Sequence, residues 1–455
     1  MQLVLTATRD TEAFRVRKFQ SYVAAMLIAM FIVFSLLNQD FNNTIPVVLC
    51  LITVQYFMLR KYGPFSSASI LLIFYSYPLF APFFTRYVMG AQYLKFGNQS
   101  IQTDFDLLFT VQLYFLISII VATITTYVLN DRRVRHSNGG SISGSVGSIP
   151  TGKSSSIVFC VLFMIMAYIT EPSFGTILTQ SYSDVTSARF AGTEFAGGLF
   201  IVFWIFAFIN YQKGYSKTLF VVLTIVATLW LALHAKRAPV LGLSFVLVIY
   251  LHSIGAVKIK YVSMVLGLVV LLFLVGEIRN SFYLGDGVEL QVSRFTDYDV
   301  ASLPGNGAGI FMSFLGSVYI TDNIQTGLLW GQSYLDQVIG IIPGFIWNIF
   351  DYTPPESYGR GVFSQHLYYN GGMHFLGPVY GNFALPGILI FSVILGYLIY
   401  FIGKSHNSAR ADTRAYAYLL TMFFPSAMWY NSMVLVSWLV YFTVLITIFR
   451  VLPRQ

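Results

Sequence analysis

Residues 105–129 read FDLLFTVQLYFLISIIVATITTYVL, an apolar run in which Asp106 is the one charged residue. A helix needs roughly 20 such residues to cross the hydrocarbon core of a bilayer. The whole chain has this character, because 56% of its 455 residues are hydrophobic and 10% are charged. Soluble domains carry about 25% charged residues. The composition therefore excludes a soluble globular protein and predicts an all-α polytopic membrane protein.

We expect about twelve transmembrane helices, because apolar runs of suitable length recur along the chain. They are expected near residues 19–38, 44–60, 65–84, 105–129, 155–170, 196–211, 218–234, 239–254, 261–276, 382–402, 414–430 and 433–449. Basic residues precede the first run and no small-residue cleavage site follows it, so we expect a retained anchor. The chain then divides into residues 1–276 with nine helices, a large loop at 277–381, and residues 382–455 with three helices.

The basic residues predict the orientation, because cytoplasmic loops retain Lys and Arg. With the N-terminus inside, the inner segments hold 19 of the 27 basic residues and only four of the 19 acidic ones. We therefore expect both termini in the cytoplasm and the large loop outside. The net charge of +8 is spread over small clusters between apolar runs. This pattern favours membrane lipids as partners and makes nucleic acid an unexpected one.

Two loops have opposite characters. The loop 277–381 is far longer than an ordinary connection, so we expect it to fold and to carry function. Its half-apolar stretches Gly309–Tyr319 and Tyr334–Phe350 predict short amphipathic helices, either interfacial or re-entrant. The inner loop 137–156 is rich in Gly and Ser and predicts a flexible cytoplasmic linker.

The motifs that would indicate a cofactor or a metal carry little weight. Residues 147–154 read GSIPTGKS and match the phosphate-binding pattern G-x-x-x-x-G-K-S. That loop needs a strand before it, whereas here a linker precedes a membrane helix. Two D-x-D triplets, 104–106 and 297–299, could hold a divalent metal. The first abuts an expected helix start, where acids cap backbone amides and favour the helix dipole, and a metal role is the less favoured interpretation of the second as well. No cofactor and no metal are expected.

Basic residues on the outer side break the charge rule and are more informative. Lys236 and Arg237 lie in a turn between two short apolar helices, and Arg279 follows the helix expected at 261–276. Charges near membrane depth are costly and generally face a cavity or a partner. Guanidinium groups fit phosphate oxygens, so this set predicts a site for a lipid diphosphate. The alternative is that each one reaches lipid headgroups or a nearby acid. Further outer basic residues are Arg189, Arg294 and Arg360.

A proton acceptor is expected in the large loop. His374 could take a proton from a substrate hydroxyl as a neutral imidazole, or it could be a structural hydrogen-bonding residue. Glu356 and Asp351 compete for the same role. Tyrosines are dense here, Tyr380 among them, and their aromatic faces with polar tips suit either a sugar or the membrane interface.

This arrangement resembles the Wzy-type polymerases of bacterial O-antigen and related surface polysaccharides, among membrane glycosyltransferases with a GT-C-like fold. The resemblance covers most of the chain as topology. As motif it rests on the turn at Lys236 and Arg237, on Arg279, on IIPGFIW at 341–347 and on LGPVYGNFALPG at 376–387. Many members re-enter the membrane with a similar L-G-x-x-Y-x-N-F-G-x-x-G run. This sequence departs from that run by placing Ala384 where Gly is common.

The resemblance implies transfer of a growing glycan from undecaprenyl diphosphate onto a lipid-linked oligosaccharide repeat unit, at the periplasmic face of the bacterial inner membrane. It implies neither a nucleotide sugar nor an obligatory metal, and it makes a chain-length regulator protein a further partner. By carry-over, Arg237 and Arg279 hold the diphosphate and Arg294 supports them. The full expected site has Arg237, Arg279, His374 and Glu356 as catalytic residues, with Lys236, Arg189, Arg294, Arg360 and Tyr380 binding substrate.

Two alternatives stay open. An O-antigen ligase shares this topology and large loop but transfers the glycan to the lipid A core; the absence of a clear ligase-type histidine signature late in the loop favours a polymerase. A flippase or secondary transporter of lipid-linked oligosaccharide also suits twelve helices. Transporters usually show two similar halves and compact loops, and this sequence shows neither.

Overall fold

The computed structural model describes the backbone of most of the apolar segments. The described residues are 44–83, 94–96, 99–101, 105–136, 149–169, 193–233, 237–256, 305–323, 327–339, 341–342, 344–350, 374–429 and 433–451. They fall into two compact units. Unit 1 takes its described residues from Met1–Asn138, Val300–Gly327 and Val379–Tyr400, and unit 2 from Gly139–Asp299, Leu328–Pro378 and Phe401–Gln455.

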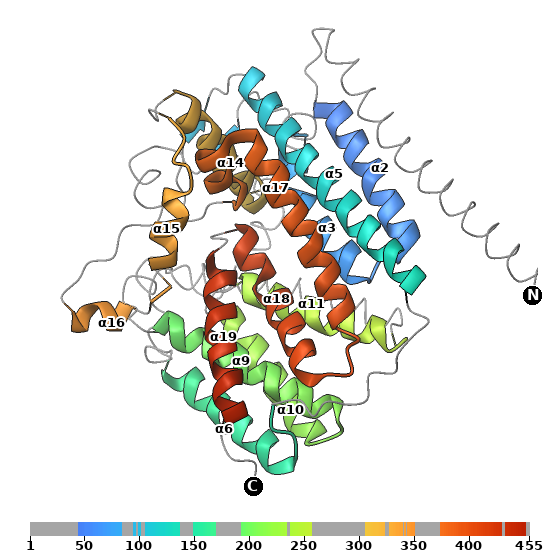
Figure 1. The fold of residues 1–455 in the computed structure, drawn as a ribbon, viewed down its shortest axis with the longest axis vertical. Helices are drawn as coiled ribbons and strands as arrows, with labels where there is room; N and C mark the ends of the chain where they lie inside the picture. The colour runs from blue at the N-terminus through green and yellow to red at the C-terminus, as the bar shows by residue number, and fades with distance from the viewer. Residues whose placement is uncertain are drawn as a thin grey trace, which may run out of the picture. The chain divides into compact units, whose positions relative to one another are not determined.

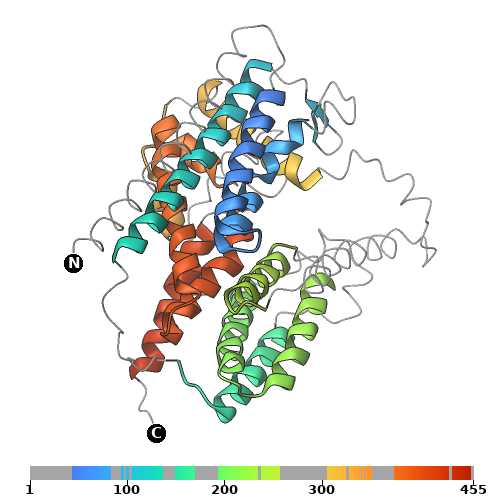
Figure 2. The same cartoon turned by 90° about the vertical axis from the view of Figure 1, so that its right-hand side faces the viewer.

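Unit 1 is a bundle of helices with a small β-hairpin. Helices α2, α3 and α5 lie side by side in it (Figures 1 and 2). Its elements are α2 (Thr44–Tyr62), α3 (Ser67–Ser76), η1 (Tyr77–Phe80), α4 (Ala81–Phe83), β1 (Leu94–Phe96), β2 (Gln99–Ile101), α5 (Phe105–His136), α14 (Gly305–Asn323) and most of α17 (Leu376–Ser405). The two strands pair antiparallel, with Lys95 opposite Ser100.

The span expected at 65–84 is not one regular helix. It consists of α3, the single 3-10 turn η1 and the short α4. Ser66 starts α3, because its hydroxyl accepts a hydrogen bond from the Ser69 N–H at 3.1 Å. Pro78 then occupies the start of η1. Proline lacks an N–H and collides with the carbonyl one turn earlier, which favours the change from α-helix to the 3-10 turn at this position.

Helices α5 and α17 run in the same direction. Hydroxyl groups join them, because the Ser118 Oγ lies 2.6 Å from the Ser392 Oγ and the Thr126 hydroxyl donates to the Gly396 carbonyl at 3.1 Å. Later residues of α5 therefore contact later residues of α17, which shows that the two helices are parallel. The expected topology requires this direction, because both helices were expected to begin on the outer side. At Gly396 a methyl group would come within 2.6 Å of the Ala122 carbonyl oxygen, so glycine permits this close approach.

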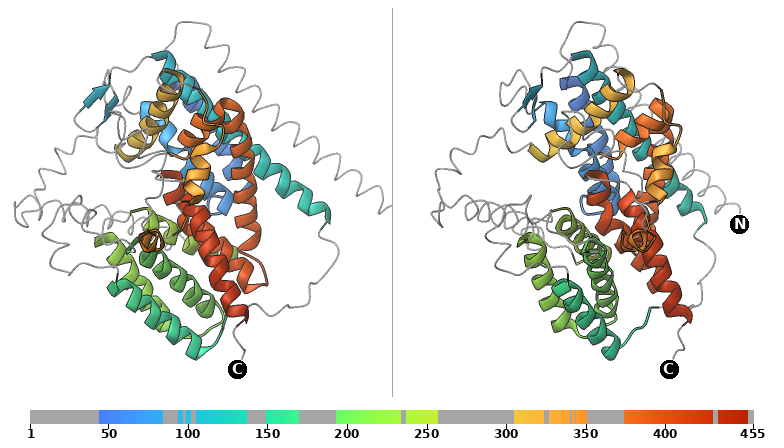
Figure 3. Two further views of the ribbon diagram at one scale, coloured as in Figure 1. Left: turned by 60° about the vertical axis from the view of Figure 1, so that its left-hand side comes forward. Right: turned by 90° about the vertical axis from the view of Figure 1, so that its left-hand side faces the viewer.

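Unit 2 is built around helix α9. Its helices are α6 (Lys153–Ile169), α9 (Thr193–Gln212), α10 (Lys217–Leu233), α11 (Arg237–Ser253), α15 (Gln332–Ile339), α16 (Gly344–Ile349), α18 (Ala411–Trp429) and α19 (Met433–Val451). Helices α6, α9, α10 and α11 lie side by side (Figure 3). Every residue from Phe200 to Ile209 is buried. A helix that is apolar on all sides is expected inside a bundle, and α9 is such a helix.

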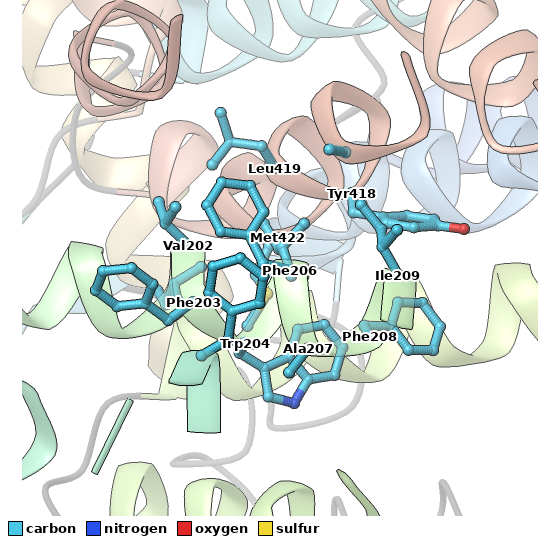
Figure 4. Packing of buried hydrophobic residues seen from close by; sticks show 14 of the residues in the cluster. Val202, Phe203, Trp204, Phe206, Ala207, Phe208, Ile209, Tyr418, Leu419 and Met422 are labelled. Carbon is cyan, nitrogen blue, oxygen red and sulfur yellow. The ribbon is translucent and has the colours of Figure 1, made fainter. Parts of the chain in front are cut away.

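Aromatic side chains surround α9. Phe208 contacts Tyr418 of α18 and Tyr250 of α11, with ring centroids 5.1 Å apart in each pair. Figure 4 shows side chains of α9 and α18 packed together, with Phe206 next to Leu419 and Met422. Phe206 also contacts Phe442 of α19 at 5.6 Å. The core of unit 2 therefore joins segments that lie far apart in the sequence.

Three helices of the described chain are long and apolar enough to cross a membrane. They lie at Ile45–Tyr62, Leu107–Asn130 and Leu376–Ser405, and six further apolar helices are shorter. Apart from the small hairpin of β1 and β2, the coarse expectation of a helical membrane protein is thus supported, while the number twelve stays a prediction. The spans expected at 19–38 and 261–276 lie outside the described residues. Each of the other ten coincides with described helices.

Helix α17 differs from its expected form in two ways. It begins at Leu376, six residues before the expected boundary at 382, because Gly377 and Pro378 are tolerated in a first helical turn but lower its hydropathy. It is also two helical segments that meet at Ala384, where φ is 51° and ψ is −145°. An L-residue with these angles is strained, whereas glycine adopts them readily. The departure from the family run, Ala384 in place of Gly, therefore falls on the break itself.

We expect Ala384→Gly to stabilise the protein. It removes a backbone strain of about 1–3 kcal/mol, although glycine returns about 0.5–1 kcal/mol of this through its greater freedom in the unfolded chain. The measurement is thermal unfolding in detergent, where the midpoint should rise. Ala417→Gly is the matched control, because Ala417 lies inside α18, where loss of the methyl group should lower the midpoint. An unchanged or lower midpoint for Ala384→Gly would show that position 384 carries no strain.

Candidate functional site

A polar pair joins α14 to the first turns of α17. The Tyr380 hydroxyl donates to both carboxylate oxygens of Asp322, at 3.1 Å to Oδ1 and 3.2 Å to Oδ2. The Tyr380 ring also contacts the ring of Tyr114 on α5, with centroids 5.5 Å apart. Tyr114, Asp322 and Tyr380 form the cluster that we call the tyrosine–aspartate cluster.

Asp322 occupies an unfavourable place for a carboxylate. It is the last residue but one of α14, where the negative end of the helix dipole opposes a negative charge. Partial burial raises the pKa of Asp322, and the hydrogen bond from Tyr380 opposes that rise. Asp322 nonetheless keeps an exposed side. An accessible carboxylate with a raised pKa is a better proton acceptor than an ordinary surface aspartate.

The cluster lies at corresponding ends of two long apolar helices. Tyr114 belongs to the third turn of α5 and Tyr380 to the second turn of α17. Both helices can cross a membrane by length and composition, and they run in the same direction. The cluster is therefore close to one end of both spans. In the expected topology this is the outer end.

The run LGPVYGNFALPG has a structural reason at several positions. Tyr380 binds Asp322, and Asn382 is fully buried, at 0% exposure. Ala384 takes the glycine-like backbone conformation at the break. At Gly387 a methyl group would lie 2.6 Å from the Phe383 Cβ and 3.0 Å from the Val379 carbonyl oxygen, so only glycine fits. The run encodes an interrupted helix with a tyrosine just before the interruption.

His374 is buried directly before α17. Its imidazole is 1% exposed, and its Nδ1 accepts a hydrogen bond from the Leu376 N–H at 3.4 Å. Burial lowers the pKa of His374 to about 3, so the ring is neutral near pH 7 but is a weak base. These features match the structural alternative that the sequence left open. A catalytic role for His374 stays a prediction.

The expected cationic set is largely outside the described residues. Arg237 is the first residue of α11, and nothing is described of its side chain. The other expected residues without a described position are Lys236, Arg189, Arg279, Arg294, Glu356 and Arg360. The structure therefore places His374 and Tyr380, and it unites Tyr380 with a partner that the sequence reading did not include.

Asp322 is the residue that sequence reasoning missed. It is separated from Tyr380 by 58 positions, so no local spacing links the two. One signal was present. The stretch Gly309–Tyr319 is half-apolar, and an acid three residues beyond it, at the end of a helix, is unfavourable unless something compensates for its charge.

The GSIPTGKS match serves a structural purpose. The Gly152 N–H donates to the Asn210 side-chain oxygen at 2.9 Å, and the Asn210 amide donates to the Pro150 carbonyl at 3.4 Å. The Ile149 N–H donates to the Asp412 carboxylate at 3.3 Å. These backbone amides are thus bound within unit 2. The flexible linker expected at 137–156 therefore extends too far toward its C-terminal end. Hydrogen bonds hold residues 149–152 in place, and α6 begins at Lys153.

The described residues contain no group of three or more His, Cys, Asp or Glu that could hold a metal ion. The class defined by fold and site is an α-helical protein with helices able to cross a membrane and a tyrosine–aspartate cluster near one end of two of them. No family model, no curated protein and no solved structure matches this chain.

Proposed function

We propose that this protein is a polymerase of lipid-linked oligosaccharide repeat units in the bacterial inner membrane, with a GT-C-like arrangement. The observation that carries the proposal is the tyrosine–aspartate cluster at the interrupted start of α17. It falls on the same run of residues that resembles the polymerase family, and that run follows the large loop. A run of residues that resembles the family and also forms a polar cluster supports this function better than sequence resemblance alone.

In the proposed reaction, the hydroxyl of the acceptor repeat unit attacks the anomeric carbon of the donor glycan. The carbon–oxygen bond to the diphosphate breaks, and undecaprenyl diphosphate leaves with the bonding electrons. The hydroxyl proton passes to a base. Arg237 and Arg279 would stabilise the charge on the leaving group, which is the type of interaction that contributes most in such sites.

Asp322 is the described residue best suited to hold the acceptor hydroxyl. Its carboxylate is partly exposed, accepts hydrogen bonds and has a raised pKa. Tyr380 fixes its orientation through the paired contacts to both oxygens. We therefore add Asp322 to His374 and Glu356 as a candidate proton acceptor, with Tyr380 as its positioning residue. The Tyr380 ring is itself buried, at 5% exposure, and packs against the ring of Tyr114, so its part in the proposed site is to position Asp322.

Arg237 has a position that favours a functional role. It is the first residue of α11, and the N-terminus of a helix favours an anion, so the proposal places the diphosphate at this end of α11. The ligase and the transporter remain the alternatives, and the following experiment separates them.

Deletion of the gene in its host, followed by gel electrophoresis of surface glycans, tests the proposal. A polymerase is required to join repeat units, so the deletion strain should carry lipid A core with a single repeat. A bare core, with polymer retained on undecaprenyl diphosphate, would instead identify a ligase. A bare core with single lipid-linked repeats held on the inner leaflet would identify a flippase. An unchanged ladder would exclude all three.

We expect Arg237→Ala and Arg279→Ala to insert normally but to lose polymer formation by about 10²–10³-fold, because each removes a charge that stabilises the leaving diphosphate. The measurement is complementation of the deletion strain, with the amount of protein in the membrane determined in parallel. Lys404→Ala is the matched control, since Lys404 is an exposed basic residue at the other end of α17. Wild-type polymer from both arginine variants would reject their assignment.

We expect Asp322→Asn to slow polymer formation by about 10²-fold, the lower bound for loss of a general base. Tyr380→Phe keeps the ring contact with Tyr114 but loses the donated hydrogen bond, so a smaller loss is expected, about fivefold for about 1 kcal/mol. Single-turnover assays with purified lipid-linked repeats measure both rates, and a pH–rate profile shows whether Tyr380→Phe shifts the apparent pKa. Asn323→Ala, next to Asp322 and also exposed, is the control. Equal rates for Asp322→Asn and Asn323→Ala would remove Asp322 from the site.

A further inference from the structure

Residues 327–350 carry the most exposed large apolar side chains of the described chain. This segment contains α15 and α16. Trp330 is 77% exposed, Ile349 and Phe350 are each 71% exposed, and Leu335 is 67% exposed. The most exposed large apolar side chain on the other described helices is Ile390, at 60%. An apolar surface of this kind marks a contact with a partner or a membrane.

The segment has almost no charge. Its sequence is GLLWGQSYLDQVIGIIPGFIWNIF, with Asp336 as the one charged residue and neither Lys nor Arg. Attraction to anionic headgroups or to an acidic protein therefore cannot hold it. What remains is burial of apolar surface, and tryptophan is enriched where a protein meets the boundary between headgroups and acyl chains.

The segment is attached to a helix with an apolar outer face. The Tyr441 hydroxyl of α19 donates to the Ile341 carbonyl, in the connection between α15 and α16. On α19, Val440 and Val444 flank Tyr441 and are 43% and 53% exposed. Side chains three or four positions apart share a helix face, so this exposed face adjoins the point of attachment. An exposed apolar face of a helix expected in the membrane therefore lies beside the point where the segment is attached.

The direction of α16 fits a helix that lies in the membrane plane. Within unit 2, α16 lies across the direction of α19, and Figures 1 and 3 agree on this. If α19 crosses the bilayer, a helix crosswise to it runs along the surface. The Trp347 indole N–H donates to the Ile342 carbonyl at 3.1 Å, which holds α16 against the preceding turn. Surface helices of this kind place their apolar side about 5–10 Å into the headgroup boundary.

We propose that residues 327–350 form a membrane-docking surface that inserts Trp330, Leu335, Ile349 and Phe350 among the acyl chains of the outer leaflet. The occupant is phospholipid, and the contact does not depend on the proposed enzymatic function. It holds the middle of the large loop at the membrane surface.

The test uses spin labels on the full chain in lipid nanodiscs. Single cysteines are introduced as Leu335→Cys and Ile349→Cys; the native Cys50 and Cys160 are buried and so react little. Ile225→Cys, at a position on α10 that is 56% exposed, is the lipid-facing reference, and Asn407→Cys in the turn after α17 is the water-facing one. Power saturation compares access by oxygen, which concentrates in lipid, with access by a water-soluble nickel chelate.

We expect labels at 335 and 349 to behave like the label at 225, with high oxygen access and low nickel access. Nickel access equal to that at 407 would overturn the proposal. Exclusion of both reagents, with spin–spin broadening that dilution by unlabelled chain removes, would overturn it in favour of a second copy.

Salt and lipid charge supply a second measurement. Because the segment lacks basic residues, oxygen access should be the same in neutral and in anionic nanodiscs, and at low and at high salt. A change in oxygen access larger than the spread of replicate measurements would contradict docking by apolar insertion.

Discussion

Backbone N–H and C=O groups inside a bilayer have no water to bind, so each spanning segment must satisfy them within a helix. This constraint explains why the described chain is helical almost throughout. It also limits how the helices hold together, because lipid is as apolar as leucine and apolar side chains gain little by leaving it. Close contacts and hydroxyl groups take over that task. Gly396 lets α17 approach α5, and the hydroxyl groups of Ser118 and Ser392 join the same two helices.

One departure from regular helix lies beside the candidate site. At Ala384 the backbone leaves the helical conformation, and such a departure in a membrane helix is tolerated where protein covers it. Asn382 is fully buried just before the break, and Gly387 permits close packing just after it. Tyr380 reaches Asp322 one turn earlier. Backbone irregularity and a polar pair therefore coincide, as they do at many functional sites, where strain is maintained by the surrounding structure.

Hydropathy predicted the helices well because it depends on local composition, and α2, α6 and α19 begin within two residues of their expected positions. Hydropathy failed to predict helix bounds at proline and glycine residues, because their effect on helix formation differs from their effect on hydropathy. Pro78 interrupts an apolar run without lowering its hydropathy much, whereas Gly377 and Pro378 belong to a helix that hydropathy starts too late. Tyr380 is predicted from its motif, and its role in a site stays a prediction. Asp322 is not predicted, because its contact with Tyr380 spans 58 positions and no local pattern encodes it.

The central position of α9 has a consequence for synthesis. Its buried stretch contacts α6, α10, α11, α18 and α19, yet α18 begins at Ala411, about 200 residues after α9 ends at Gln212, and α19 follows it. At about 5–20 residues per second, a nascent α9 waits at least about ten seconds for its last neighbours. If α9 has entered the membrane by then, its uncovered sides face lipid during that interval, and they are apolar enough to do so. The helix therefore has to be compatible with two surroundings in turn, and a chain that ends before α18 would leave it permanently in the first.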